Sequence, residues 1–121
     1  MSEAGSGLAA YEAAEILLER LAELSTDLRA AAMFGPSGEQ LAATDGGLDW
    51  GERAGALWTA ADESASAPAE AIHIGSESGE VFAVRGESAS IVATSERFAL
   101  ASLMFCDLRA VLRDLDAELA D

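Results

Sequence analysis

Lysine is absent from this chain of 121 residues, whose seven basic residues are all arginine. Against them stand 22 acidic residues, and the formal net charge is −15. A surface of this charge repels nucleic acid and anionic membranes, so we expect neither as a partner. A G-x-x-x-x-G-K-[ST] phosphate-binding loop is also excluded, because it requires a lysine. Two origins of this composition stay open: a GC-rich genome and a salt-adapted cytoplasm.

Cysteine and histidine occur once each, as Cys106 and His73. One cysteine cannot form an internal disulfide, and one histidine with one cysteine cannot build a histidine-bearing zinc site. We expect Cys106, inside the apolar run 98–106, to be a small core residue, and His73 to be structural or interfacial. No set of residues has the pattern of a nucleophile with its base or of a cofactor loop. The sequence therefore predicts a non-enzymatic protein with no catalytic residues, no cofactor and no metal site.

Long hydrophobic segments are missing as well. The longest run, 98–106, is far shorter than the roughly 20 residues that span a bilayer. Residues 1–7 are polar and acidic and lack the parts of a signal peptide, so we expect a flexible leader there. Residues 8–121 are predicted to form a single domain, because a chain of this length supports one core. The prediction is a cytoplasmic protein without membrane insertion.

Apolar residues make up 50% of the chain, and their spacing changes in an ordered way. Steps of three and four residues mark helices, whereas alternation between turn residues marks strands. The resulting order is αββαβββα, which indicates an α+β domain. The predicted helices cover 8–26, 50–65 and a segment from a cap at Thr94 or Ser95 to near the C-terminus; the predicted strands cover 29–35, 39–44, 71–76, 80–85 and 90–93.

The last predicted helix carries the most regular apolar stripe, and we expect it to pack on the core along its whole length. The stripe consists of Phe98, Ala101, Phe105, Leu108, Leu112, Leu115 and Leu119.

The predicted helix 50–65 is unusual on the faces that point away from its apolar stripe. Asp49 is its predicted N-cap, with Glu52 completing a capping box. Trp50 lies on the stripe and is predicted to be core, whereas Trp58 lies at the edge of the stripe and fits a core edge or a protein–protein contact equally well. Small residues on a helix surface favour close approach of another element. Here they are Gly51, Gly55, Ala56, Thr59 and Ala60.

In the order and spacing of these elements, the chain resembles the Roadblock/dynein light chain family over about residues 8–120. The segments that carry the resemblance are 17–21 in the first helix, 31–35 and 40–42 with the turn residue Gly38, the meander 72–74, 81–84 and 90–93, and the helix from Phe98. The resemblance implies a five-stranded antiparallel sheet with helices on both faces, a layer architecture that is also profilin-like.

The resemblance also implies a function. Domains of this family form homodimers in which the third strands pair at their edges and the two copies of the second helix lie side by side. Prokaryotic relatives act as partners, scaffolds or activators of Ras-like small GTPases. We therefore expect a non-enzymatic homodimeric regulator or scaffold that binds a Ras-like small GTPase. The residues expected at the dimer and partner interface are Arg53, Gly55, Ala56, Trp58, Thr59, Ala60, Ile72, His73 and Ile74.

Two other classes of protein share parts of this pattern. A small-molecule sensor of the PAS or GAF type also combines an antiparallel sheet with helices, although a PAS domain places several short helices where this chain has one. A sensor also needs a roomy pocket, whereas the alanine-rich predicted strands favour close packing. A profilin-like actin binder shares the topology but has no identifying surface here.

Overall fold

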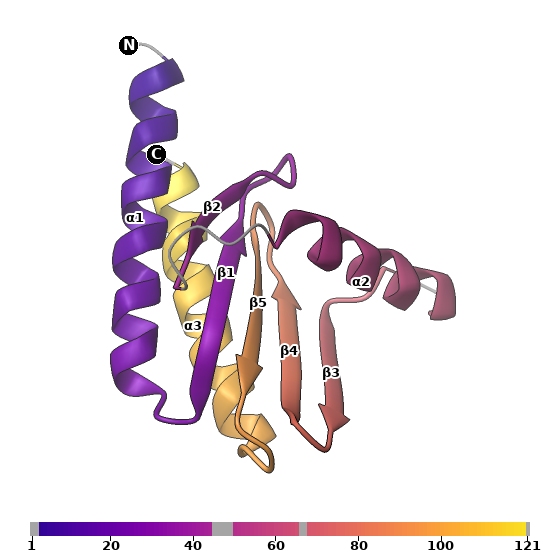
Figure 1. Ribbon diagram of the computed structural model, residues 1–121. Helices are drawn as coiled ribbons and strands as arrows, with labels where there is room; N and C mark the ends of the chain where they lie inside the picture. The colour runs from indigo at the N-terminus through magenta and orange to yellow at the C-terminus, as the bar shows by residue number, and fades with distance from the viewer. Residues whose placement is uncertain (1–2, 45–49, 66–67, 121) are drawn as a thin grey trace.

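The computed structural model describes residues 3–44, 50–65 and 68–120, and it confirms the predicted order αββαβββα (Figure 1). The chain begins with α1 (Glu3–Leu24) and the hairpin β1 (Leu28–Phe34) and β2 (Gln40–Ala43). Helix α2 (Gly51–Ser64) separates the hairpin from the meander β3 (Ala71–Ser76), β4 (Gly79–Arg85) and β5 (Ser90–Ser95). Helix α3 (Ala101–Ala120) follows.

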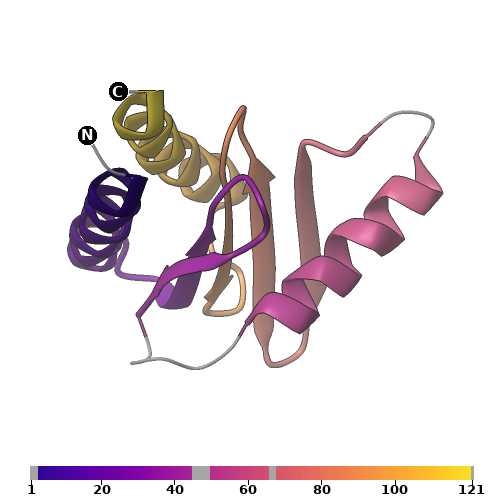
Figure 2. The ribbon, with the colours of Figure 1, turned by 90° about the horizontal axis from the view of Figure 1, so that it is seen from above.

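The strands form one antiparallel sheet of five strands in the order β2-β1-β5-β4-β3. The hairpin and the meander meet where β1 pairs with β5, so β2 and β3 are the two edge strands. Helices α1 and α3 lie together on one face of the sheet and α2 lies on the other (Figure 2). The α+β class and the helices on both faces are therefore confirmed.

Alternation along the strands divides the core into two layers, because successive side chains point to opposite faces of a sheet. Met33, Phe82 and Ile91 are fully buried in the larger layer, beneath α1 and α3. Ala32, Ala83 and Val92 lie in the smaller layer, beneath α2. Alanine at two of these three positions leaves little bulk on the α2 side of the sheet.

The ends of two helices differ from the predictions. Helix α1 begins at Glu3, so residues 3–7, predicted as part of a flexible leader, belong to the helix, while residues 1–2 lie outside the described part of the chain. Helix α3 begins at Ala101, because β5 continues to Ser95 through pairing with Glu80 and Leu28. Phe98 has φ 65, which is not helical, and its side chain is 80% exposed. Its predicted place on the buried stripe is wrong.

Two further predictions concern single side chains. Cys106 is exposed, and its predicted core position is wrong; it lies two residues before the fully buried Leu108. The predicted N-cap Asp49 lies outside the described residues. The structure has Trp50 at the N-cap of α2 without a side-chain cap, and the Trp50 backbone N–H donates to Gln40 Oε1 at 2.8 Å.

None of the described helices is both long and apolar enough to cross a membrane.

Candidate partner-binding surface

The β3 edge and the adjoining helix α2 are the elements on which the sequence placed the interface. Within the described residues, β3 pairs on one side only, with β4. Its outer side carries backbone groups that another strand could pair with. Ile72 is half-buried, whereas His73 and Ile74 are exposed, Ile74 to 46%. The sheet therefore ends in a partly apolar, accessible strand.

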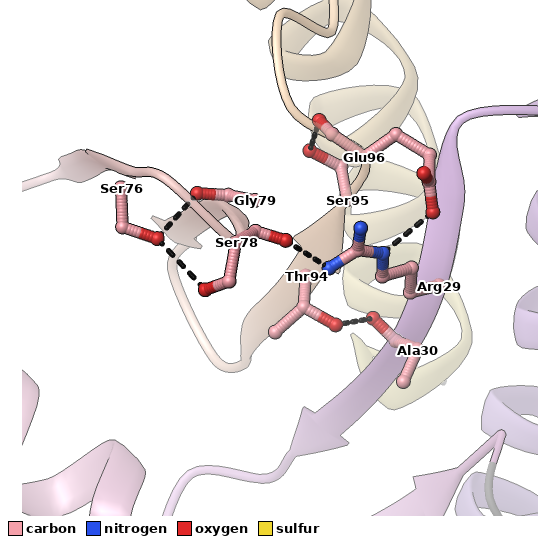
Figure 3. Close-up of polar contacts among 8 residues, drawn as sticks. All are labelled: Arg29, Ala30, Ser76, Ser78, Gly79, Thr94, Ser95 and Glu96. Carbon is pink, nitrogen blue, oxygen red and sulfur yellow. Dashed lines mark hydrogen bonds and ion pairs between the residues drawn. The ribbon is translucent and has the colours of Figure 1, made fainter.

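The turn that precedes β4 is held firmly, which fixes the end of this edge (Figure 3). Arg29 of β1 reaches across the end of the sheet, forming an ion pair with Glu96 at 2.5 Å and donating to the carbonyl of Ser78. Gly79 has φ 151, and a Cβ there would lie 2.5 Å from the carbonyl oxygen of Ser95. Any other residue at this position would push the β3–β4 turn away from β5.

Register fixes the two faces of β3, because directly opposed residues in an antiparallel pair share a face. Ile72 and Ile74 lie opposite Ala83 and Val81, on the α2 side of the sheet. His73 lies opposite Phe82, on the side of α1 and α3. The predicted interface residues of β3 thus divide between both faces of the edge.

His73 is tied into the sheet as well as exposed. Its ring stacks on Phe82 with centroids 4.4 Å apart, and Phe105 contacts Phe82 edge-on at 5.2 Å. His73 Nε2 also contacts the carboxylate of Glu80, which is mostly buried. The pKa of Glu80 is lowered, first by this hydrogen bond and further by the backbone N–H groups of Phe98 and Ala99, although desolvation opposes the shift. The Glu80 carboxylate thus links His73 of the edge strand β3 to the loop before α3.

Helix α2 buries Ala54 and Trp58 against the sheet and exposes the rest of its predicted interface residues. These exposed residues are Arg53, Gly55, Ala56, Thr59 and Ala60. Trp58 is only 9% exposed and packs in the core layer beneath the helix. It is therefore a core-edge residue, and the alternative of an exposed aromatic anchor does not fit its position.

Trp58 is also the centre of a contact that fastens α2 to the sheet. The Arg85 guanidinium lies over its ring at 4.1 Å and pairs with Asp62 at 3.3 Å. Asp62 accepts the backbone N–H of Ala69 at 2.9 Å, and this bond, followed by those from Arg85, lowers the pKa of the carboxyl group. No sequence pattern indicated this arrangement, because its members come from α2, β4 and the segment before β3. The indole Nε1 has no hydrogen-bond partner among the described residues.

On its other flank, α2 leaves part of the sheet uncovered. A groove of about 360 Å³ lies there between the helix and the strands. Trp50, Ala54 and Leu57 form its helix side, and Arg53 also lines it. The sheet side consists of Val81, Val92 and Thr94, which the sequence did not single out. Strand alternation puts all three on one face of the sheet, but how far a helix covers that face cannot be read from the sequence.

The described residues contain no group of three or more His, Cys, Asp or Glu side chains that could hold a metal ion. The geometry provides surfaces for contact: an open strand edge, a helix face of small residues and an apolar groove between them.

Comparison with known proteins identifies the fold. No protein-family model and no curated protein matches the sequence. Its similarity to solved structures shows that the chain has a Roadblock-type fold. A Roadblock/LC7 domain from Streptomyces avermitilis is similar with TM-score 0.72 and 13% identity, covering 88% of this chain and 98% of that one. The predicted resemblance is confirmed at the level of the fold.

The gliding protein MglB shares this fold. MglB from Thermus thermophilus is similar with TM-score 0.75 and 16% identity, covering 92% of this chain and 91% of that one. An MglB with a tetrameric arrangement is similar with TM-score 0.61 and 18% identity, covering 90% of this chain and 92% of that one.

Proposed function

We propose that this protein is a non-enzymatic, homodimeric regulator or scaffold that binds a Ras-like small GTPase. The observation that carries the proposal is the open β3 edge lying beside an exposed helix face of small residues. The Roadblock-type fold supports it, because the function expected from the sequence resemblance depends on that fold. The tetrameric MglB supports self-association as a property compatible with the fold.

Self-association would cover the β3 edge, which is exposed in the single chain. An exposed edge strand with apolar side chains is a template for further pairing, and proteins normally cover or blunt such edges. Pairing β3 with β3 of a second copy would continue the sheet and satisfy the outward backbone groups. The exposed small residues of α2 would then allow the two helices to approach closely. Ile72, His73 and Ile74 would lie at the junction of the two sheets.

The GTPase is proposed to bind the composite surface that the two α2 helices form. A single copy offers one narrow helix face, whereas two copies offer a broader surface. Because Trp58 is buried, the exposed Arg53 and Thr59 are the residues that we expect to contact the partner. Arg53 would supply the charged contact.

Oligomeric state is the first measurement. Light scattering at micromolar concentration and moderate salt should give the mass of a dimer. Ala60→Arg should shift the mass toward the monomer, since a bulky charge would lie where the helices meet, while Ala117→Arg on the exposed face of α3 serves as the matched control. A wild-type monomer would contradict the proposed dimer.

Partner binding is the second measurement. A purified Ras-like GTPase from the same organism, loaded with GDP or with a non-hydrolysable GTP analogue, should form a complex that prefers one nucleotide state. The protein alone should neither bind nor hydrolyse GTP. Ala60→Arg should weaken the complex and Ala117→Arg should not. If no such GTPase binds in either state while the dimer persists, the GTPase proposal fails and the dimer remains.

A further inference from the structure

We propose that the groove between α1 and α3 binds an amphipathic helix of a partner protein, one that carries lysine or arginine beside its apolar face. Helices α1 and α3 lie on the face of the sheet opposite α2 (Figure 2). The inference is therefore independent of the surface proposed for the homodimer and its GTPase.

The two helices form the walls of the groove. They lie side by side and run in opposite directions, so the end of α1 meets the start of α3 (Figures 1 and 2). Two hollows open along the seam between them. The larger, of about 530 Å³, lies between residues 9–20 of α1 and 114–118 of α3. The smaller, of about 70 Å³, lies where Leu24 meets Leu100 and Leu103.

Helical spacing joins the two hollows into one groove, because steps of three and four residues align side chains along a helix. The stripe on α1 is Ala9, Ala13, Ile16, Arg20 and Leu24, and the stripe on α3 is Leu103, Asp107, Ala110, Asp114 and Ala117. All of these except Ala110 line one of the hollows. At about 1.5 Å per residue, the stretch from Leu103 to Ala117 is about 21 Å long. A partner helix of about four turns would span it.

Exposed apolar side chains gather at this seam. Seven large hydrophobic side chains are exposed in the described part of the chain, and four of them line the two hollows. Leu24 is 76% exposed, Leu103 56% and Ile16 51%. Leu24 and Leu103 belong to different helices but line the same hollow, so their exposure is concentrated in one place. Apolar side chains that are exposed together mark a surface of protein contact.

The charges along the seam define the chemistry of the occupant. The two hollows are lined by one guanidinium, that of Arg20, and by five carboxylates, those of Glu12, Asp27, Asp107, Asp114 and Glu118. None of these six groups forms an ion pair within the described residues. The lining is more acidic than the chain as a whole, which has 22 acidic residues against seven basic ones. A basic helix would be attracted here, whereas a second copy of this chain, at −15, would be repelled.

The shape of the groove suits a helix. Ala9, Ala13 and Ala117 line the larger hollow, and their small side chains let a third helix approach closely. An aliphatic side chain of that helix would enter the smaller hollow beside Leu24 and Leu103 and act as its anchor. The long stems of its lysines or arginines would lie over the alanines, while their charged ends reach the carboxylates at the rim.

Selection from a peptide library tests the inference. Random peptides of about 18 residues, long enough for about four helical turns, would be displayed on phage and selected on the immobilised protein. Enriched peptides should carry apolar residues at steps of three and four, with lysine or arginine beside them. A synthetic copy of the most enriched peptide should bind more weakly as salt rises, because salt screens exposed ion pairs. Fluorescence anisotropy measures its dissociation constant. No enrichment, or enriched peptides without basic residues, would overturn the inference.

Two variants separate this groove from the surface on α2. Ala117→Arg puts a bulky positive charge into the larger hollow, so it should weaken peptide binding about tenfold or more and leave self-association unchanged. Ala60→Arg on α2 should leave peptide binding unchanged. Circular dichroism confirms that both variants are folded. A peptide that binds Ala117→Arg as tightly as the wild type would overturn the groove and leave the proposed dimer standing, whereas a monomeric wild type that still binds the peptide would do the reverse.

Further variants test the anchor and the charges separately. Leu103→Ser should weaken peptide binding, whereas Tyr11→Ser should not, because Tyr11 is exposed on α1 but lines neither hollow. Asp114→Asn should weaken binding up to about fivefold, which corresponds to about 1 kcal/mol for one exposed ion pair. Glu52→Gln removes the same charge from α2 and should have no such effect. Equal effects of each variant and its control would contradict binding at this groove.

Discussion

At the scale of single residues, the side chains that organise this surface contact partners on other elements of the fold. Arg85 reaches the Trp58 ring and Asp62, and Glu80 reaches His73 and the loop before α3. None of these partners could be assigned from the sequence, because helical or strand spacing says which face a residue occupies and not which charged group it meets. The carboxyl groups of Asp62 and Glu80 both have a lowered pKa, so each contributes stability that depends on pH.

Glu80 gives a prediction for acid. A carboxyl group whose pKa is lowered on folding stabilises the protein above its unfolded value, here near the ordinary 4.5, and loses that contribution as the pH falls through the folded pKa. Glu80→Gln should therefore lower the melting temperature at neutral pH. Below about pH 4, the difference in melting temperature between the variant and the wild type should become smaller. Thermal melts between pH 7 and pH 3 would measure this, with Glu118→Gln on the exposed face of α3 as the control. A constant difference across this range would contradict the proposed role of Glu80.

At the scale of elements, the order, type and approximate bounds of the helices and strands could be predicted because each is encoded locally. Spacing along α1, α2 and α3 and turn residues between the strands contain that information. The start of α3 could not be predicted, because Phe98 continues the stripe in spacing but the pairing of Ser95 with Glu80 and Leu28 extends β5 into the segment. Tertiary pairing here overrode a local pattern.

Phe98 and Phe105 test this boundary directly. Both belong to the predicted stripe, but Phe98 is 80% exposed, whereas Phe105 is half-buried and its ring contacts Phe82. Phe105→Ala should lower the free energy of unfolding by about 2–3 kcal/mol, somewhat less than the loss of a fully buried phenylalanine. Phe98→Ala should change it by no more than about 0.5 kcal/mol. Urea denaturation would compare them. Equal losses would mean that Phe98 packs on the core in solution.

At the scale of the whole molecule, the two faces of the sheet differ in how well they are covered. Helices α1 and α3 close one face over the larger core layer, whereas α2 covers only part of the other and projects past its edge. The interface on α2 and β3 stays a prediction from the sequence, and most of the residues named for it are exposed in the structure. The groove could not be predicted, since its existence depends on the angle at which α2 crosses the sheet.

Net charge gives the last prediction. At −15 per chain, a dimer concentrates twice that charge in one particle, and long-range repulsion between the copies opposes its formation. Salt screens this repulsion, because the Debye length falls from about 30 Å at 0.01 M to about 8 Å at physiological ionic strength. Both the melting temperature and the dimer fraction should therefore rise over this range. Sedimentation velocity and thermal melts at several salt concentrations would measure them. A dimer fraction independent of salt would show that the acidic residues are too dispersed to govern assembly.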